Sequence, residues 1–288
     1  MTMKTVWRRL VGGLRGASAP SPVTDADWRP SAPGGEVVYA IGDVHGRADL
    51  LGSMVSAIWH DIDSHGIRKP VIVPLGDYID RGPETRRVLQ ILLAIRDSGE
   101  VEFRPLMGNH EQIMLGFLSD DPMVGAKWVR FGGAETLRAY GVPPPSPSVQ
   151  DPDIWRRTQA AFIKALPQRH LAFLEALEIC HERGDYFFAH AGVRPGVRLA
   201  DQDETDLLWI RAPFLQEAKE LEKIVVHGHT PEEIPMFKDC RIGLDTGAYA
   251  TGRLTAIRLE GTTRRILQAR ARPSGPPEIA WYEEGEVG

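Results

Sequence analysis

Cysteine is scarce in this chain, because only Cys180 and Cys240 occur among its 288 residues. Two cysteines cannot form the dense disulfide framework of a small secreted domain, and neither lies in the paired spacing of a zinc-thiolate site. The sequence also lacks an apolar run long enough to cross a bilayer. We therefore expect a cytoplasmic protein without stable membrane insertion.

Positive charge is not in excess either. Lys and Arg number 34 and Asp and Glu number 39, which gives a formal net charge of -5. Proteins that bind nucleic acid usually show a basic excess or a basic stripe, so we expect no nucleic-acid partner. Hydrophobic residues make up 42% and charged residues 25% of the chain, values that are ordinary for a globular protein. Composition does not predict an oligomeric state.

The chain divides into three regions of different character. Residues 1–35 are expected to be a flexible N-terminal segment, because residues 17–35 are rich in Pro, Ser, Ala and Gly. Residues 36–271 are predicted to form one domain. Residues 272–288, with Pro, Gly and acidic residues, are predicted to be a loose C-terminal tail.

The first residues contain a short amphipathic pattern. Trp7, Leu10, Val11 and Leu14 fall on one helical face with basic residues around it, as in a membrane-surface or targeting helix. Three glycines nearby weaken any helix. A solvated basic tail is the simpler interpretation.

Strands and helices are expected to alternate in the first third of the domain. Apolar, β-branched runs predict strands over residues 37–41, 71–75 and 101–106, and helical patterns lie between them over residues 48–60 and 85–95. Such alternation favours parallel strands with helices packed on the sheet. Further strands are predicted over residues 186–189, 223–226, 241–244 and 253–259.

The region between these two groups of strands is mainly helical in pattern. Residues 112–180 are predicted to be an insertion that caps the domain. The run Pro143-Pro144-Pro145-Ser146-Pro147 interrupts it, and such a run forms an extended surface loop because proline cannot continue a helix.

Five short segments place metal-binding residue types at the ends of apolar runs. They are Gly42-Asp43-Val44-His45-Gly46, Gly76-Asp77-Tyr78-Ile79-Asp80-Arg81-Gly82, Gly108-Asn109-His110-Glu111, His190-Ala191-Gly192 and Gly228-His229-Thr230. The carboxyl ends of parallel strands meet at one edge of a sheet, where ligands bind. Asp43 and His45 are two residues apart in extended chain and should point to the same side. A mixed set of nitrogen and oxygen ligands suits manganese, iron or zinc better than calcium, and two such metals suit phosphoester hydrolysis.

These motifs resemble the phosphoprotein phosphatase (PPP) family of metallophosphoesterases, with the bacterial and phage-type serine/threonine protein phosphatases most similar. The resemblance runs from about residue 37 to residue 260, is weakest over residues 112–180, and includes Leu244-Asp245-Thr246-Gly247-Ala248. It implies the calcineurin-like α/β (α+β) fold, in which a central β-sandwich is flanked by helices on both sides. The helical insertion would cap this sandwich.

The same resemblance implies two divalent metal ions per chain, with manganese expected and iron or zinc as alternatives. The ligands carried over from the family motifs are Asp43, His45 and Asp77 for one metal and Asp77, Asn109, His190 and His229 for the second. The family hydrolyses phosphoesters by direct attack of a metal-bridging hydroxide.

Catalytic roles are implied as well. His110 would be the general acid that protonates the leaving oxygen, and Asp80 would orient it. Arg81 and Arg211 would bind the phosphate oxygens, together with Asn109 and His110. Arginine suits this role because its planar fork matches phosphate oxygens.

The function implied is that of a metal-dependent phosphomonoesterase, namely a serine/threonine protein phosphatase with a phosphoprotein or phosphopeptide as substrate. The alternative is a symmetrical dinucleoside tetraphosphate hydrolase or another small-molecule phosphatase. Those hydrolases tend to lack the Asp80-Arg81 pair and to carry Asp in place of Glu111. A non-catalytic metal-bound scaffold is a third hypothesis, and the presence of every ligand and of His110 argues against it.

Two positions need a separate interpretation. Met107 stands where many family members have an arginine, and Arg104 is a candidate to replace it. His227 lies two residues before the expected ligand and is assigned a supporting or packing role.

Aromatic residues leave one alternative open. Phe131-Gly132-Gly133-Ala134, with Thr136, Leu137 and Tyr140, either lines a substrate groove or starts a helix with a core face. Trp128, Trp155 and Trp209 are expected in the core.

Overall fold

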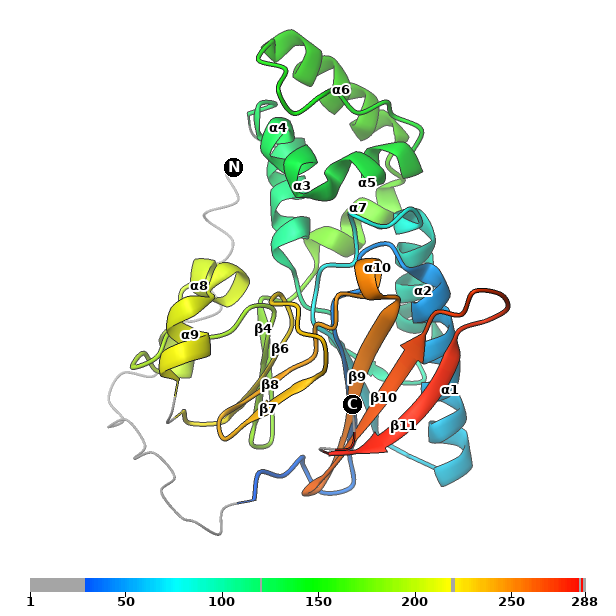
Figure 1. Ribbon diagram of the computed structural model, residues 1–288, viewed down its shortest axis with the longest axis vertical. Coiled ribbons are helices and arrows are strands. Elements are labelled where there is room, and N and C mark those ends of the chain that lie inside the picture. The colour runs from blue at the N-terminus through cyan, green and yellow to red at the C-terminus, as the bar shows by residue number, and fades with distance from the viewer. Residues whose placement is uncertain (1–28, 120, 219–220, 285, 287–288) are drawn as a thin grey trace.

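A computed structural model describes residues 29–119, 121–218, 221–284 and 286 (Figure 1). Its first half contains β1 (Val37–Ile41), α1 (Ala48–His65), β2 (Pro70–Pro74), α2 (Thr85–Ser98), β3 (Glu102–Phe103), α3 (Asn109–Ser119), α4 (Val124–Trp128), the π-helical turn η3 (Val129–Gly133), α5 (Ala134–Ala139), α6 (Pro152–Ala165) and α7 (Gln168–Glu175). Its second half contains β4 (Cys180–Arg183), β5 (Tyr186–Ala189), η4 (Leu199–Asp201), α8 (Glu204–Trp209), α9 (Ala212–Glu217), β6 (Ile224–His227), β7 (Met236–Lys238), β8 (Arg241–Gly243), α10 (Ala248–Thr251), β9 (Arg253–Glu260), β10 (Thr263–Arg270) and β11 (Glu278–Glu283).

The strands form two mixed sheets. One has the order β11-β10-β9-β1-β2-β3 and the other the order β4-β5-β6-β8-β7. Strands β1, β2 and β3 are parallel, as are β5, β6 and β8. The carboxyl ends of each parallel group therefore lie at one edge of their sheet.

Strand β1 is buried on both faces, and its residues alternate between two apolar clusters. Val38 and Ala40 face an apolar cluster shared with residues of the second sheet such as Val226. Tyr39 and Ile41 alternate to the other face and join the cluster that contains the apolar sides of α1 and α2. A strand buried on both faces has a nearly continuous apolar sequence, as the run from Val37 to Ile41 does.

Helices cover the outer faces of both sheets. Helices α1 and α2 lie against the six-stranded sheet, and α8 and α9 lie beside the five-stranded sheet (Figure 1). In the second contact, Leu207 of α8 and Phe214 of α9 share a cluster with Phe187 and Val225 of β5 and β6. The predicted fold class, a β-sandwich with helices on both sides, is confirmed.

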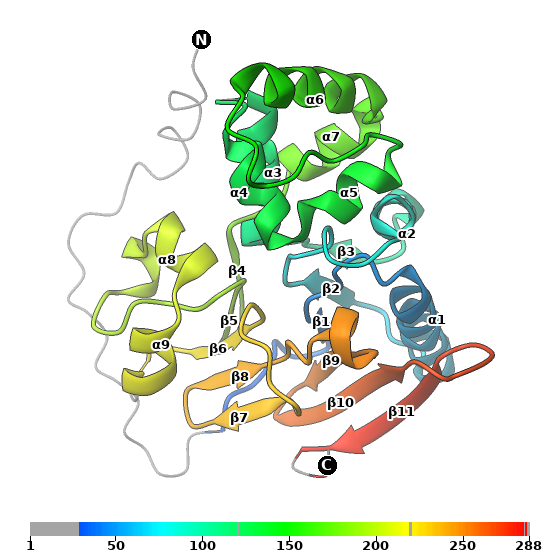
Figure 2. The same cartoon turned by 45° about the horizontal axis from the view of Figure 1, so that its top comes forward.

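Helices α3 to α7 form a cap at one end of the sandwich (Figure 2). Phe117, Trp128 and Trp155 of this cap belong to the same apolar cluster as the buried faces of α1 and α2. The cap therefore packs onto the domain through a shared core. Trp128 and Trp155 are fully buried, as expected from the sequence.

The prediction of a loose C-terminal tail was wrong over residues 278–283. Residues 278–283 of the expected loose tail form β11, which pairs antiparallel with β10 and places Ile279 and Trp281 against the α1 side. The described part of the expected flexible lead-in is also held in place, because Ser31 N–H donates to Asp185 and Ala32 N–H donates to Gly261 O. The amphipathic pattern from Trp7 to Leu14 lies outside the described residues.

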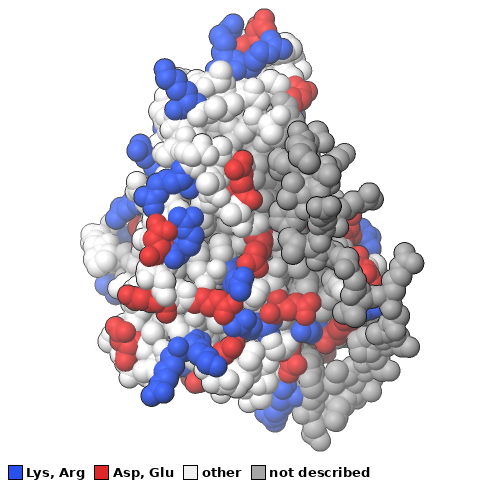
Figure 3. Space-filling model, turned by 180° about the vertical axis from the view of Figure 1, so that it is seen from behind, with Lys and Arg blue, Asp and Glu red and all other residues white. Residues whose placement is uncertain are grey.

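The surface of the described chain mixes charges of both signs. On the face shown in Figure 3, Lys and Arg lie among Asp and Glu. Within the described chain, Arg183 forms ion pairs with Glu36 and Glu102. No helix in the part of the chain that the structure describes is long and apolar enough to cross a membrane.

Candidate metal centre

The motif residues come together at the carboxyl edge of both sheets. Asp43 follows β1, Asp77 follows β2, His190 follows β5 and His229 follows β6. Asn109 is the first residue of α3. All five side chains are buried.

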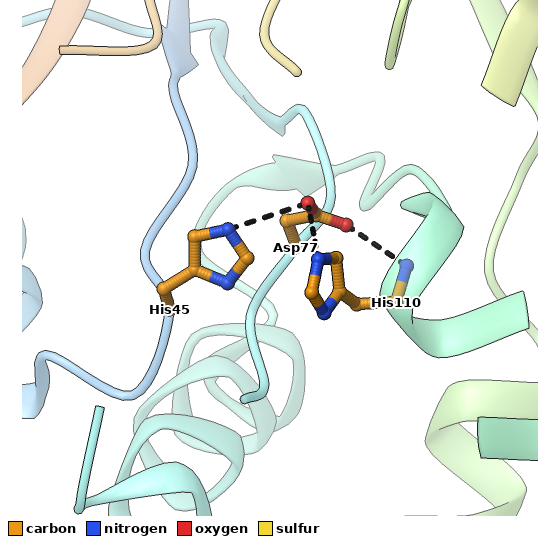
Figure 4. Close-up of side chains that lie close together, drawn as sticks. All are labelled: His45, Asp77 and His110. Atoms are coloured by element: carbon orange, nitrogen blue, oxygen red, sulfur yellow. Dashed lines mark hydrogen bonds and ion pairs between the residues drawn. The ribbon is translucent and has the colours of Figure 1, made fainter. Parts of the chain in front are cut away.

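Asp77 lies at the centre of this group. Its Oδ2 is 3.4 Å from Nε2 of His45 and 3.7 Å from Nε2 of His110, and both rings point toward the carboxylate (Figure 4). On its other side, Oδ1 is 3.4 Å from Nε2 of His190. The donor atoms form two groups, and within each group all of them lie within 4.8 Å of one another. One group is His45, Asp77 and His110, and the other is Asp77, His190 and His229. Either group could hold a metal ion.

Asn109 joins the second group. Its Oδ1 lies 2.9 Å from His190 Nε2 and 2.9 Å from His229 Nδ1. His190 Nδ1 lies 2.9 Å from Leu75 O, and His45 Nδ1 lies 2.8 Å from Ile79 O. A carbonyl can only accept, so both Nδ1 atoms carry the proton, and in a neutral ring Nε2 keeps a lone pair aimed at the centre.

Asp43 lies at the edge of the centre and outside both groups of the described donor atoms. Its two oxygens accept from the His229 backbone N–H at 3.2 and 3.1 Å. Burial, followed by the charges of Asp245 and Asp77, raises the pKa of Asp43 well above its usual range. Burial likewise raises the pKa of Asp245 to about 6. Asp245 was quoted in a sequence motif but not predicted as a site residue.

The chemistry of these donors fits divalent cations. Burial lowers the pKa of His45 to about 3 and that of His229 to about 2, and it also lowers the pKa of His190. Neutral imidazole is the form that binds a metal. Burial and the charge of Asp77 raise the pKa of both Asp43 and Asp245, and a bound cation would offset that cost of ionising them.

The backbone of the centre is strained. In the described chain the non-glycine residues with positive φ are all in this region: His45, Asp77, Asp80, Arg81 and His229. Such conformations cost free energy and concentrate at functional sites. Gly76 has φ of +102°, and a Cβ there would collide with the backbone of Gly108, so the turn before Asp77 requires glycine.

Glu111 fixes the two central loops to each other. Its carboxylate accepts from the backbone N–H groups of Gly108, Asp77, Tyr78 and Ile79 at 2.8 to 3.2 Å. Four donors satisfy a buried carboxylate. Glu111 therefore holds Asp77 in register with the start of α3.

His110 and Asp80 form a buried pair beside Asp77. His110 Nδ1 donates to Asp80 Oδ2 at 2.7 Å. Trp128 Nε1 donates to the same oxygen at 2.8 Å, and the Thr136 hydroxyl donates to Oδ1 at 2.6 Å. Burial lowers the pKa of His110, but Asp77 and the bond to Asp80 outweigh it, and the net pKa is raised. His110 thus holds a proton more readily than its neighbouring imidazoles.

Both predicted arginines border the centre. Arg81 Nη1 lies 3.0 Å from His45 Nε2, and Arg211 Nε lies 3.2 Å from His229 Nε2. Each guanidinium donates toward the lone pair of a neutral ring. The two cations therefore approach the group around Asp77 from separate segments of the chain.

The remaining sequence interpretations differ in outcome. Arg104 does not replace an arginine at Met107, because it pairs with Glu102 and Glu178 and is not placed at the centre. His227 is buried and contacts Arg241 at 3.2 Å, in keeping with a packing role.

Sequence reasoning missed Trp128 and Thr136 as partners of Asp80. Trp128 was predicted as core, and its indole N–H could not be paired from the sequence. Thr136 belongs to the segment Phe131 to Tyr140, for which the sequence allows either a substrate groove or a helix with a core face. The possibility of a groove was the one signal that this segment could reach the site.

The chain matches known proteins in sequence. The family model for the calcineurin-like phosphoesterases matches residues 37–257. The asymmetrical bis(5'-nucleosyl)-tetraphosphatase PrpE of Bacillus mycoides is 27% identical over 229 residues, which cover 76% of this chain and 88% of the relative. Serine/threonine-protein phosphatase 2 of Escherichia coli is 27% identical over 236 residues, with 77% and 93% covered.

One solved structure shares the fold. A crystal structure provisionally described as that of a diadenosine tetraphosphatase has a TM-score of 0.53, is 17% identical, and covers 90% of this chain and 100% of its own. That likeness concerns the fold alone.

The expectation of a phosphoric-ester hydrolase is confirmed by the family match. Enzymes of this family use divalent metals, and the two His and Asp groups suit such ions. The chain belongs to the calcineurin-like phosphoesterase family.

Proposed function

We propose that this enzyme is a serine/threonine phosphoprotein phosphatase. The proposal rests most on the buried pair of His110 and Asp80, linked at 2.7 Å. Serine and threonine alkoxides are poor leaving groups, so their release needs a proton from a positioned acid. A phosphate leaving group, as in a dinucleoside polyphosphate, needs that proton far less.

We further propose the metal ligands. His45, Asp77 and Asp43 would hold one divalent ion, and Asp77, Asn109, His190 and His229 the other. The spacing of the donors around Asp77 supports the His45 and Asp77 pair of the first set and the Asp77, His190 and His229 part of the second. Asp43 would turn from the His229 N–H toward the first ion. Two ions bound there would supply an activated water and neutralise phosphate charge during in-line displacement. Manganese is the expected metal, with iron or zinc as alternatives.

The protein groups then have separate tasks. Arg81 and Arg211 would bind phosphate oxygens and hold the ester in line for attack, because their guanidinium groups border the centre from two sides. Asp80 would keep the His110 ring oriented with Nε2 toward the substrate oxygen. His110 would pass its proton to that oxygen, and water would restore it.

A second candidate is hydrolysis of a dinucleoside tetraphosphate. It is favoured by the name of the B. mycoides relative, which is a bis(5'-nucleosyl)-tetraphosphatase. That relative is named for the asymmetrical reaction, whereas the alternative that the sequence suggests is the symmetrical one.

Phosphate release by manganese-loaded protein tests the proposal. We expect phosphoserine and phosphothreonine peptides to have higher kcat/KM than diadenosine tetraphosphate. His110→Asn should lower kcat on the peptides by about 10²- to 10⁴-fold, the usual contribution of a general acid, while retaining metal. Its effect on p-nitrophenyl phosphate should be smaller, because nitrophenolate leaves without a proton.

The matched control is His60→Asn, since His60 is an exposed residue of α1. It should leave kcat unchanged on every substrate. Fast cleavage of the dinucleotide with slow peptide turnover would replace the proposal by the second candidate. Equal losses on peptide and nitrophenyl ester would remove the acid role from His110.

A further inference from the structure

We propose that residues 4–15, the basic amphipathic segment, dock as a helix into an apolar pocket of the cap. This cap pocket has a volume of about 610 Å³ and is lined by residues of α3, α6 and α7. None of the predicted metal ligands lines it, so the inference goes beyond the proposed function and does not depend on it. The occupant is a segment of this same chain that lies outside the described residues.

The wall of the cap pocket is mainly apolar. Helix α3 packs against α6 and α7 (Figure 2), and the pocket is lined by Leu115 and Leu118 of α3, Ile163 of α6 and Leu171 of α7. The three leucines are only half-buried, and Ile163 is exposed. Exposed apolar side chains gathered at one place mark a binding surface, and pockets of about 300 to 1,000 Å³ are of the size that buries a ligand.

The basic amphipathic segment has the pattern that such a pocket accepts. Four apolar residues share one helical face: Trp7, Leu10, Val11 and Leu14. Their spacing is that of the anchors by which an amphipathic helix lies in an apolar groove. At about 100° per residue, Gly12, Gly13 and Gly16 fall on the opposite face and leave the apolar face complete. Short helices owe their stability to packing, and the cap pocket supplies a surface that the sequence alone does not reveal.

The charges of the segment and of the pocket are complementary. At about 100° per residue, Lys4, Arg8 and Arg15 flank one side of the apolar face. Two exposed carboxylates line the pocket, Glu175 of α7 and Glu204 of α8. Neither forms an ion pair with a described residue. Opposite charges across an interface fix the orientation of a docked segment more than they add affinity.

The intervening chain is long enough to reach the pocket. Ser31 N–H donates to Asp185, in the turn that joins β4 to β5. Ile179 lines the pocket and lies just before the other end of β4. Extended chain rises about 3.3 Å per residue, so Asp185 and Ile179 are roughly 20 Å apart. The stretch from Leu14 to Arg29 extends to roughly 50 Å, which exceeds that distance.

Tethering makes weak intrinsic affinity sufficient. A ligand joined by a short linker has an effective concentration in the millimolar range. If a free copy of the segment binds with a dissociation constant of about 10 to 100 μM, the tethered copy fills the pocket in about 90 to 99% of molecules. Competition from the tethered copy then weakens binding of the free copy by about 10- to 100-fold.

The cap pocket adjoins the surroundings of the metal centre. Gln112 lines the pocket, accepts from Trp209 Nε1 at 2.7 Å and donates to Glu204 at 3.2 Å. The ring centroid of Trp209 is 6.3 Å from that of His229. The expectation that Trp209 lies in the core is therefore only partly met, because the residue is half-buried between the pocket and the centre.

Competition with a free copy of the segment tests the docking. The probe is a fluorescein-labelled peptide of residues 3–17, and its dissociation constant from the full chain is measured by fluorescence anisotropy. The wild-type chain should bind it weakly, because the tethered segment occupies the pocket. The double variant Leu10→Asp and Leu14→Asp replaces two apolar anchors by carboxylates and frees the pocket. We expect it to bind the peptide about 10- to 100-fold more tightly than wild type.

The matched control for the segment is the double variant Gly12→Asp and Gly13→Asp. It adds the same charge on the opposite helical face. This control should bind the peptide as weakly as wild type. If both double variants bind the peptide equally tightly, the apolar face does not dock and the inference is overturned.

A second pair of variants locates the bound peptide. Ile163→Asp, added to the chain with the freed pocket, should weaken peptide binding at least about tenfold, because it places a charge against an apolar anchor. Ile163 is 51% exposed, so the fold should persist, and the melting temperature checks this. The control is Ile234→Asp, because Ile234 is 42% exposed and does not line the pocket. Equal effects of the two changes would place the peptide elsewhere and overturn the inference.

The carboxylates of the pocket give a smaller and separate effect. Glu175→Gln and Glu204→Gln, each in the chain with the freed pocket, should weaken peptide binding by about 1.4- to fivefold, the range of an exposed ion pair. The effect should vanish at high salt. Loss of binding that is independent of salt would contradict the predicted charge pairing.

Three further results would overturn the inference. If wild type binds the peptide as tightly as the chain with the freed pocket, the tethered segment does not occupy the pocket. If no variant binds the peptide, the pocket serves another ligand. If wild type is a dimer in sedimentation and Leu10→Asp with Leu14→Asp makes it a monomer, the segment occupies a second copy. None of these measurements uses phosphate release, so failure of the proposed function would leave the docking intact.

Discussion

Trp128 Nε1 lies 2.8 Å from Asp80 Oδ2, the oxygen that also accepts from His110 at 2.7 Å. Trp128 belongs to the cap and Asp80 to the loop after β2. The cap therefore contributes directly to the orientation of the His110 ring. Thr136 acts in parallel on Oδ1, and its hydroxyl oxygen also accepts from Asp80 N–H at 2.9 Å.

Removing the indole N–H tests this arrangement. Trp128→Phe keeps an apolar ring in the core but leaves Asp80 with one donor fewer. We predict a fall in kcat of about tenfold on phosphopeptides, the usual effect of losing such a supporting bond, with metal content unchanged. Trp155→Phe is the control, because Trp155 is equally buried in the cap but donates to Val149 O. Similar losses of kcat in both variants would mean that only packing matters.

Asp77 is predicted to hold both metal ions. Asp77→Asn keeps the shape of the side chain and tolerates its positive φ of 51°, so the fold should persist. Because a neutral amide cannot bridge two cations as a carboxylate does, we predict loss of both metals and turnover near the buffer rate. Metal analysis by mass spectrometry measures the first effect. The control is Asp49→Asn, because Asp49 lies on α1 and forms an ion pair with Arg47. This variant should keep its full metal content. Retention of two metals by Asp77→Asn would contradict the assignment.

Gly132 is predicted to be intolerant of a side chain. Gly132→Ala combines an unfavourable φ of +114° with a contact on Arg81. We expect a loss of about 1 to 3 kcal/mol in the free energy of unfolding, measured by urea denaturation. Gly141→Ala is the control, because its φ is +75° and nothing lies within 4 Å of the added Cβ. Gly141→Ala should cost less, since it carries the backbone term alone. Equal costs would show that the contact with Arg81 is unimportant.

Both cysteines are free thiols that should react slowly. Burial raises the pKa of Cys180 to about 11 and also raises that of Cys240. At pH 8 a thiol of pKa 11 is ionised in about one molecule in a thousand. We predict that iodoacetamide modifies the native protein far more slowly than the protein in urea, as followed by intact mass. Rapid alkylation of the native protein would contradict the raised pKa of these thiols.

Much of the centre could be predicted from local sequence. The Gly-Asp turns after β1 and β2 and the histidines after β5 and β6 stand in short segments whose strands are apolar and β-branched. Period and turn chemistry are local properties, so the strand ends follow from them, and parallel pairing brings the side chains of each sheet to one edge of that sheet. The meeting of the two edges depends on how the sheets pack.

The partners of those side chains could not be predicted in this way. Trp128 and Thr136 reach Asp80 across 48 and 56 residues. Such contacts depend on how the cap docks, and the apolar pattern of the cap is the same whichever side chain meets Asp80. Arg104 is an example of a residue that the sequence suggests for the site but that lies elsewhere. It could replace the arginine missing at Met107, yet it pairs with Glu102 and Glu178.

The last strand was missed because its surroundings are misleading. Proline, glycine and acidic residues flank β11, and they suggested a tail. The pairing of Leu267 with Trp281 across β10 and β11 makes the strand, and pairing with a neighbouring strand is a tertiary property.

Anomalous diffraction from crystals of the manganese-loaded protein tests the central claim most directly. The account predicts two manganese peaks per chain, about 3.5–4 Å apart as in other two-metal sites, with the Asp77 carboxylate between them and His45 and His190 on opposite sides. A single peak, or peaks remote from Asp77, would contradict the binuclear centre from which the proposed chemistry follows.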